Sequence, residues 1–307
     1  MPQGSILGPL LFLIYINDVV NSSPVLSYIL FADDTNIFYS HPCLNTLIRT
    51  LNIELTKVKQ WFDCNKLSLN IKKTNFIHFT TRNAPENINI DIKIDTILLE
   101  QKESTKFLGV YLDKNLNCKT HIQKITSSIS RSLGILCKLK DMLPFKTLLV
   151  LYNALTLPHI SYCNTVWGNS TKSNTNIILH LQKKAMRICT GSHYLANTDP
   201  LFHQLNTLKV NDINVIQTAC FMYRFSVNLL PSNFNDIFSY NRNIHNYPTR
   251  ISNNFHITNP RISLTHRSIR HHGPDIWNSL PEHIKQSKSL STFKTKVKNY
   301  LISNYSH

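Results

Sequence analysis

The chain has 307 residues, 42% of them hydrophobic, and carries 33 Lys and Arg against 17 Asp and Glu, for a net charge of +16. This length and composition are typical of a globular protein with a sizeable core, which excludes a fibrous or wholly disordered chain. The sequence contains no long uncharged apolar run of membrane-spanning length, so it predicts no membrane partner. Its seven scattered cysteines contain no CxxC pair, which argues against a zinc knuckle or a disulfide framework and indicates an intracellular protein, in the nucleus or the cytoplasm.

The charge is unevenly distributed along the chain. Residues 1–42 carry three acids and no Lys or Arg, and residues 43–118 carry a net +3. Residues 119–307 carry 22 Lys and Arg against six Asp and Glu. An acidic stretch followed by a long basic region is a plausible footprint for nucleic-acid phosphates. The alternative is a basic protein without such a partner.

The first 16 residues are apolar but lack the basic start and the cleavage site of a signal peptide, so we expect them to form part of the core. The stretch Leu30–Thr35 then places two adjacent carboxylates, Asp33 and Asp34, between β-prone runs at 26–31 and 35–39. This pattern predicts a hairpin with an acidic turn. Paired carboxylates repel each other unless cations neutralise them, and oxygen ligands suit Mg²⁺. A solvated Asp-Asp turn is the alternative.

Hydrophobic periodicity predicts most of the later elements. Short strands are expected at 75–80, 88–94 and 106–112, and apolar residues at helical spacing predict helices at 43–64, from Ile122 to Leu139, from Pro144 to about Pro158, at 172–190 and from Leu290 to Leu301. Residues 231–270 are rich in Asn, Ser, Pro and Arg and are expected to be loop or a partly ordered linker. Trp277 is expected to anchor a core, and the adjacent His271 and His272 are a poor metal site because no third ligand lies nearby.

Four short motifs occur in a fixed order around the acidic pair. They are Pro2-Gln3-Gly4-Ser5, Phe31-Ala32-Asp33-Asp34, Asn70-Ile71-Lys72-Lys73-Thr74 and Phe107-Leu108-Gly109. Together they resemble the reverse transcriptase (RNA-directed DNA polymerase) of non-LTR retrotransposons, most closely the jockey type. The segment from Gly273 to Pro281, followed by a basic terminal helix, looks like the tail found on many jockey-type elements.

The resemblance implies an α+β fold in three parts. Residues 1–118 would form a partial palm, an antiparallel sheet with helices, and residues 119–190 a helical thumb-like region. Residues 191–307 would form a basic carboxy-terminal region with the linker 231–270 and the terminal helix. The family's first catalytic Asp lies on a strand upstream of the Pro-Gln-Gly motif, so we expect an amino-terminally truncated reverse transcriptase. Asp18 is no substitute, because the family places it at the end of a helix.

The resemblance also implies the chemistry of nucleotidyl transfer. A dNTP would be added to a DNA primer on an RNA template, with two Mg²⁺ ions in the complete family site. Asp33 and Asp34 would be catalytic metal ligands, and Lys73 would be either a catalytic proton donor to pyrophosphate or a surface lysine on a turn. The residues expected to contact the template and the incoming nucleotide are Pro2, Gln3, Gly4 and Phe31, and those expected to hold the primer end are Phe107, Leu108 and Gly109.

Three functions are open from the sequence. The first is a mobile-element reverse transcriptase whose activity is impaired because the first catalytic Asp strand is missing. The second is a non-catalytic nucleic-acid-binding remnant, and the third is a protein-interaction module that uses the terminal helix. The salt dependence of binding distinguishes the last two functions, because phosphate binding weakens steeply as salt rises and binding through a hydrophobic interface does not.

Overall fold

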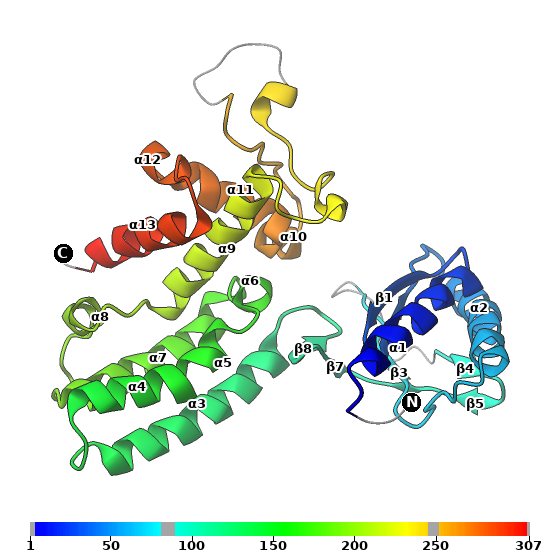
Figure 1. Ribbon diagram of the computed structural model, residues 1–307, viewed down its shortest axis with the longest axis horizontal. Coiled ribbons are helices and arrows are strands. Elements are labelled where there is room, and N and C mark those ends of the chain that lie inside the picture. Colours follow the sequence, from blue (N-terminus) through cyan, green and yellow to red (C-terminus); the bar gives the residue numbers. More distant parts are fainter. Residues whose placement is uncertain (1–3, 81–89, 245–251, 306–307) are drawn as a thin grey trace. The chain divides into compact units, whose positions relative to one another are not determined.

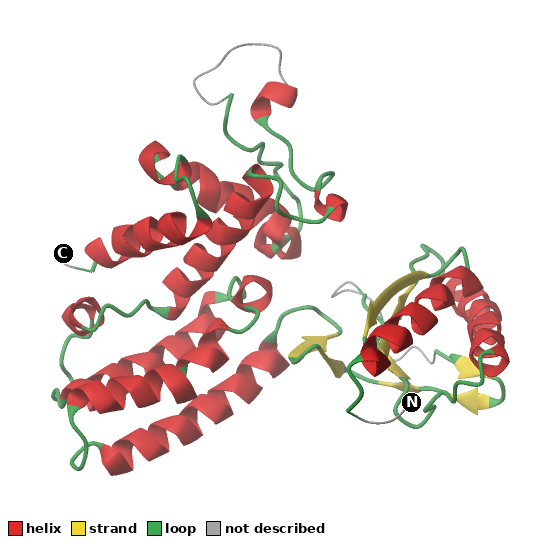
Figure 2. Ribbon diagram, in the orientation of Figure 1, coloured by secondary structure: helices red, strands yellow, loops and turns green. Residues whose placement is uncertain are grey.

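The computed structural model describes residues 4–80, 90–244 and 252–305. The chain forms two compact units, residues 1–105 and 106–307 (Figure 1). Helices and short strands both occur in the first unit, and helices dominate the second (Figure 2). The fold is therefore α+β, as expected, whereas the assignment of palm, thumb and carboxy-terminal region to 1–118, 119–190 and 191–307 stays a prediction. Within the described ranges, no helix is long and apolar enough to cross a membrane.

The first unit contains two long helices and several short strands. In chain order these are α1 (Leu7–Asn17), the 3-10 helix η1 (Asp18–Ser22), β1 (Ser27–Phe31), β2 (Asp34–Phe38), α2 (Leu44–Cys64), β3 (Asn75–Phe76), β4 (Lys93–Ile94), β5 (Ile97–Leu98) and β6 (Glu100–Gln101). The predicted helix at 43–64 and the predicted hairpin are confirmed. The strands pair two by two: β1 with β2 and β4 with β5 antiparallel, and β3 with β6 parallel. A single antiparallel sheet, as a palm implies, is not formed by the described strands of this unit.

The predicted strands 75–80 and 88–94 are shorter than expected, and the predicted strand 106–112 is instead two strands joined by a turn at Leu108 and Gly109. Only Asn75–Phe76 of the segment 75–80 pairs with another strand. The predicted strand 88–94 begins outside the described residues, and its described part alternates as predicted, with Ile90, Ile92 and Ile94 all buried. Only Lys93–Ile94 pairs as a strand. The alternation therefore predicts which face of the segment is buried. It does not predict how many residues pair with a neighbouring strand, because that depends on the partner.

Helix α2 joins two small cores because its apolar stripe faces both. Val58 and Phe62 pack beneath the β1–β2 hairpin, and Leu55 packs with the buried isoleucines at 90, 92 and 94. Buried Glu54 on the same helix accepts a hydrogen bond from Ser23 Oγ at 2.6 Å and pairs with Lys57 Nζ at 2.7 Å. The bond from Lys57, followed by that from Ser23, lowers the pKa of the Glu54 carboxyl. A buried carboxylate with these partners keeps its charge without a large desolvation cost.

Helix α1 differs from the expectation. Only Ile16 of this helix is buried, and Leu7, Leu10 and Ile14 are 62%, 55% and 63% exposed. The expectation that the apolar first 16 residues form core is therefore wrong for the described part. Because the helix is apolar on every side, a small unit can cover only one face of it.

The second unit consists mainly of helices after one strand pair. Its elements are β7 (Ser104–Phe107), which begins at the boundary, β8 (Val110–Asp113), α3 (Lys119–Leu139), α4 (Phe145–Leu155), α5 (Leu157–Ser161), α6 (Asn164–Trp167), α7 (Lys172–Thr190), α8 (Asp199–Gln204), α9 (Val210–Ser226), η2 (Ser232–Phe234), η3 (Asn241–Asn243), α10 (Ser263–Arg267), α11 (Ile269–Ser279), α12 (Glu282–Lys285) and α13 (Leu290–Ser303). The four predicted helices of this region are confirmed, and α4 ends before Pro158, which begins the separate helix α5.

One hydrophobic core runs through the second unit. Helix α3 packs along α7, and α9 packs against α11 and α13. Fully buried Gln182 on α7 donates to Tyr152 Oη at 2.9 Å and to the Leu208 carbonyl at 2.8 Å, and it accepts from the Val210 amide at 2.9 Å. This side chain ties α7 to α4 and to the start of α9.

The predicted loop or partly ordered linker 231–270 contains short ordered elements. Its described residues contain η2, η3, α10 and a β-bridge between Tyr240 and Phe255. Phe238 and Phe255 are buried, and Phe255 packs 6.0 Å from Trp277 between ring centroids. Trp277 is 5% exposed, which confirms it as a core anchor. Isolated aromatics among polar residues can build a core without any periodicity that would reveal them.

Candidate active site

The acidic pair lies at the end of the β1–β2 hairpin. The strands pair antiparallel, with Phe31 opposite Asp34 and Leu30 opposite Thr35. The turn consists of Ala32 and Asp33, so Asp33 occupies the tip and Asp34 begins the second strand. The hairpin follows from the sequence, because two β-prone apolar runs flank Asp33, which is a good turn former.

The hairpin has one packed face and one open face. Tyr28, Leu30 and Ile37 pack against the core beneath the hairpin, and the hydroxyl groups of Tyr28 and Ser22 lie 3.0 Å apart. Phe31 is 58% exposed and shares the open face with Asp34, because directly paired residues point to the same side of a sheet. A ligand that reaches Asp34 therefore also reaches the Phe31 ring.

The turn is strained. Ala32 has a φ of +51°, a left-handed conformation that costs a residue with a Cβ about 1–2 kcal/mol. A positive φ at the first central position occurs in the primed hairpin turns, where glycine adopts it without this cost. Strain of this kind persists where surrounding structure holds it and is concentrated at functional sites. Eight other non-glycine residues of the described part also have a positive φ, so the conformation of Ala32 agrees with a functional tip but does not by itself indicate one.

Neither carboxylate is neutralised by the described part of the chain. Asp33 and Asp34 are exposed, and their side chains have no hydrogen-bond or ion-pair partner there. Two adjacent, unpaired carboxylates are a hard oxygen donor set that suits Mg²⁺. The set is small, since the described residues contain no group of three or more His, Cys, Asp or Glu side chains that could hold a metal ion. Asp33 and Asp34 thus fit part of a metal site.

Lys73 lies in a tight turn built by its own motif. The Asn70 carbonyl accepts the amides of Lys73 at 3.0 Å and Thr74 at 3.1 Å, and the Thr74 hydroxyl also donates to it at 3.0 Å. The Asn-x-x-Lys-Thr pattern is therefore a self-contained turn that presents an exposed lysine. No described hydrogen bond or ion pair joins Lys73 to Asp33 or Asp34, so both interpretations of this lysine stay open.

The Pro-Gln-Gly motif is described only in part. Pro2 and Gln3 lie outside the described residues. Gly4 is exposed and has a φ of +86°, and a Cβ added to it would meet no atom within 4 Å. Glycine is required here by its backbone conformation and not by lack of space.

The Phe-Leu-Gly motif belongs to the second unit and forms the tip of the β7–β8 pair. Leu108 and Gly109 have φ values of +44° and +86°, as the two central residues of a type I′ turn require. The Tyr162 hydroxyl donates to the Leu108 carbonyl at 2.6 Å, and a Cβ on Gly109 would lie 3.0 Å from the Tyr162 ring. Phe107, which precedes the turn, is half-buried.

Tyr162 is a site residue that the sequence did not indicate. It is separated from Leu108 by 54 residues and carries no motif of its own. The indole of Trp167 donates to the Tyr162 carbonyl at 2.8 Å, and this bond fixes the backbone at Tyr162. The turn expected to hold a primer end is thus supported by a tyrosine held by a buried tryptophan.

Comparisons with known proteins agree with the motifs. The family model described as reverse transcriptase (RNA-dependent DNA polymerase) matches residues 1–112. The chain is 29% identical over 222 residues to the probable RNA-directed DNA polymerase from transposon BS of Drosophila melanogaster, across 69% of this chain and 24% of that protein. It is 23% identical over 290 residues to the RNA-directed DNA polymerase from mobile element jockey of the same organism, across 91% of this chain and 30% of that protein. The chain thus spans less than a third of the length of these relatives. No solved structure matches it.

Proposed function

We propose that this chain is part of an RNA-directed DNA polymerase of a jockey-type mobile element, because the reverse transcriptase family model matches residues 1–112. The observation that carries the proposal is the exposed, unpaired acidic pair on a strained hairpin tip inside the matched segment. Its substrates are a dNTP, a DNA primer and an RNA template.

Each site residue has a role in nucleotidyl transfer. Asp33 holds divalent metal, with Asp34 beside it, and bound Mg²⁺ activates the primer hydroxyl and stabilises the leaving pyrophosphate. The Phe31 ring, on the same face as Asp34, lies against the incoming nucleotide. Lys73 donates a proton to pyrophosphate, and the Leu108–Gly109 turn holds the primer end.

The carboxylates of a polypeptide with only these 307 residues do not complete the site. The resemblance implies three carboxylates, and no described group of three metal-ligating side chains includes the acidic pair. Each carboxylate missing from a set of three leaves the two metal ions of the family site less firmly held. We therefore expect this polypeptide alone to be a poor catalyst until a further carboxylate is supplied.

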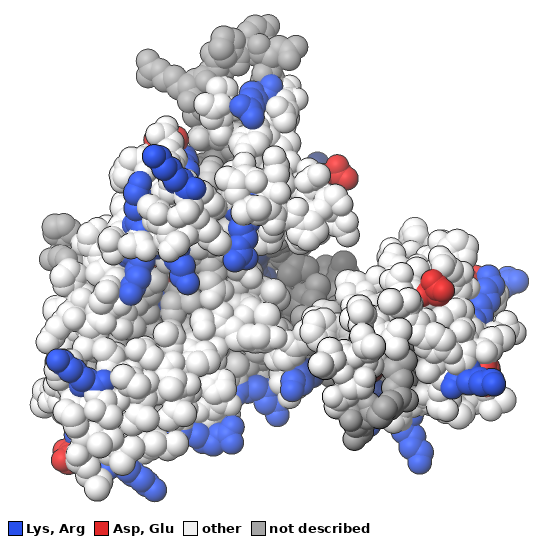
Figure 3. Space-filling view, viewed as in Figure 1, with Lys and Arg blue, Asp and Glu red and all other residues white. Residues whose placement is uncertain are grey.

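Nucleic-acid binding does not require the missing ligand. The second unit, residues 106–307, carries 24 Lys and Arg against seven Asp and Glu. Lys and Arg are spread over the visible face of this unit, with few acids between them (Figure 3). Such a surface attracts phosphates by releasing their counterions. This charge supports a second candidate function for the polypeptide alone, a protein that binds nucleic acid without chemistry.

Primer extension on an RNA template with Mg²⁺ tests both candidates. The chain is compared with an Asp33→Asn, Asp34→Asn double variant, and primer–template binding is measured for both across a salt series. We expect neither protein to extend the primer, and both to bind with a log K that falls by about 0.9 per neutralised phosphate as log salt rises.

Two results would change the account. Extension by the unmodified chain that the double variant loses would mean that the acidic pair suffices and that the expected impairment is wrong. Binding that is insensitive to salt would refute the nucleic-acid candidate and favour a protein partner for the carboxy-terminal helix.

A further inference from the structure

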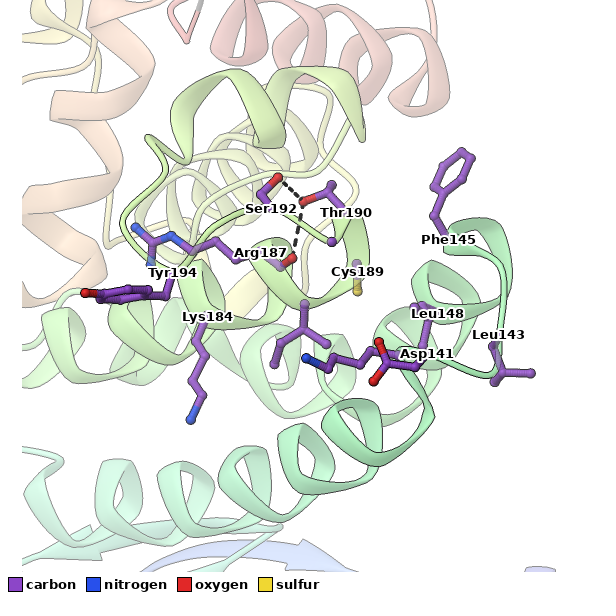
Figure 4. Close-up of a pocket in the computed structure, with 13 residues that line it drawn as sticks. Asp141, Leu143, Phe145, Leu148, Lys184, Arg187, Cys189, Thr190, Ser192 and Tyr194 are labelled. Carbon is purple, nitrogen blue, oxygen red and sulfur yellow. Dashed lines mark hydrogen bonds between the residues drawn. The ribbon is translucent and has the colours of Figure 1, made fainter.

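A pocket of about 720 Å³ lies in the second unit between the α3–α4 turn and the carboxyl end of α7. Its volume is in the range of small-molecule and nucleotide sites. Figure 4 shows Lys184, Arg187 and Tyr194 on one side of the pocket, and Asp141, Leu143 and Phe145 on the other. The proposed polymerase chemistry uses none of these residues.

The pocket has an excess of positive charge. Lys140, Lys184 and Arg187 line it together with one acid, Asp141, and none of the three cations forms an ion pair with a described residue. Lys140 follows α3 and Arg187 lies in the last turn of α7, where a cation offsets the helix dipole. The dipole accounts for these two positions but does not account for Lys184, which lies almost a turn earlier.

The guanidinium of Arg187 is held in place. Its Nε–H donates to the Ala196 carbonyl at 3.0 Å, and the Arg187 carbonyl accepts the Ser192 amide at 3.0 Å. One N–H of the fork is therefore used to fix the side chain, and the terminal N–H groups remain available. A preorganised guanidinium loses little freedom when it binds a phosphate.

Two exposed aromatic rings lie at the same pocket. Tyr194 is 73% exposed and Phe145 is 47% exposed. The loop that carries Tyr194 is ordered by hydrogen bonds, because the His193 carbonyl accepts the Ala196 amide at 2.9 Å and His193 Nδ1 accepts the Leu195 amide at 3.3 Å. The Tyr194 ring also contacts the His193 ring at 4.5 Å between centroids. The loop presents an aromatic ring to solvent beside cations.

We propose that this pocket binds one or two nucleotides of a single-stranded nucleic acid, with a base on Tyr194 or Phe145 and separate phosphates on Lys184 and on Arg187. Cations beside aromatic platforms are the usual combination in single-strand binding. A duplex offers the same phosphates, but its base faces are already stacked and cannot reach a concave site. The inference extends the proposed function, since it specifies where unpaired template is held.

Fluorescence anisotropy tests the proposal, with the full chain and three labelled probes of equal length, about ten nucleotides. The probes are single-stranded RNA, single-stranded DNA of the same sequence, and a blunt duplex. The variants are Tyr194→Ala, Tyr194→Phe and Lys184→Gln. Lys172→Gln is the matched control, because Lys172 is exposed at the other end of the same helix.

The expected results differ for each variant. Tyr194→Ala weakens single-strand binding about fivefold or more without changing its salt dependence, and Tyr194→Phe keeps it, because stacking needs the ring and not the hydroxyl. Lys184→Gln lowers the salt slope by about 0.7, the value for one phosphate of a single strand. Lys172→Gln changes neither quantity, and the duplex affinity is unchanged by Tyr194→Ala. The ratio of RNA to DNA affinity identifies which strand the pocket prefers, and either preference supports it.

Unchanged single-strand binding in both Tyr194→Ala and Lys184→Gln, with wild-type circular dichroism, would overturn the proposal. An equal loss of duplex binding would also overturn it, because the pocket would then act only through the general charge. The acidic pair is not involved, so the Asp33→Asn, Asp34→Asn variant should bind single strands normally. The two proposals can therefore fail separately, because the polymerase proposal is judged by primer extension and this one by the binding differences.

Discussion

Replacing Gln182 with Met should strongly destabilise the helical unit. The side chain is fully buried and makes three hydrogen bonds, to Tyr152 Oη, to the Leu208 carbonyl and from the Val210 amide. Methionine has nearly the same volume, so the substitution removes the hydrogen bonds and leaves no cavity.

The magnitude follows from the groups left without partners. The Leu208 carbonyl and the Val210 amide are buried backbone groups that lose their Gln182 partner in this variant. Each group left without a hydrogen bond costs about 1–3 kcal/mol of stability. The Tyr152 hydroxyl also loses its partner, but because it can rotate, its loss costs less. A total of about 3 kcal/mol corresponds to a fall of roughly 6–12 °C in melting temperature for a unit of this size.

Thermal melts followed by circular dichroism at the helical band measure this effect, because most helices belong to the second unit. Gln123→Met on α3 is the matched control, since Gln123 is exposed and such substitutions change stability by less than about 0.5 kcal/mol. A Gln182→Met melting temperature within about 1 °C of the unmodified chain would refute the reasoning, since 1 °C corresponds to well under 1 kcal/mol.

Three other predictions can be tested with the same protein. Burial lowers the pKa of His121 and of His272, so below about pH 6.5 the unfolded chain binds protons that the folded protein does not. The urea midpoint should therefore be constant above about pH 6.5 and fall towards pH 5. A midpoint that rises on acidification would contradict this. Gly109→Ala should destabilise the β7–β8 turn by about 1–2 kcal/mol, because alanine at a φ of +86° is strained and its Cβ would lie 3.0 Å from the Tyr162 ring. Hydrogen exchange of the Val110 amide should accelerate, and unchanged exchange would count against the turn geometry. Leu10→Lys with Ile14→Lys should raise the concentration at which light scattering begins, since both side chains are mostly exposed on α1, and an unchanged threshold would mean that this face does not drive association.

Where local patterns determine the structure, the sequence alone was sufficient to predict the helices and the hairpin. The amphipathic helices α2, α3, α7 and α13 follow their apolar spacing closely. The acidic hairpin also follows from β-prone apolar runs on either side of a good turn former, Asp33. These elements are encoded by neighbours within a few residues, so periodicity alone reveals them.

The rest depends on contacts that no local pattern records. Nothing in the sequence around Ala32 demands a positive φ, because alanine has no preference for it. Phe255 lies in a polar stretch and is nevertheless 1% exposed. Tyr162 contacts the Leu108 turn across 54 residues of sequence, and only the tertiary packing brings Lys140 and Arg187 to the lining of one pocket. Periodicity also misjudged α1, because an apolar helix is buried only where a partner exists to cover it.

A chimera tests the central claim most directly. In it, residues 1–112 replace the matching segment of the RNA-directed DNA polymerase from mobile element jockey of Drosophila melanogaster, so that the remaining site is supplied by the relative. Extension of a DNA primer on an RNA template is then measured for the chimera, for Asp33→Asn and for the control Asp91→Asn, which removes another exposed carboxylate of the first unit.

The account expects the chimera to extend the primer and Asp91→Asn to leave the rate unchanged. Asp33→Asn should lower the rate by more than about 100-fold, because losing a metal ligand costs more than losing its supporting residues. Extension by the Asp33→Asn chimera at the rate of the parent chimera would contradict the assignment of the acidic pair to the polymerase site.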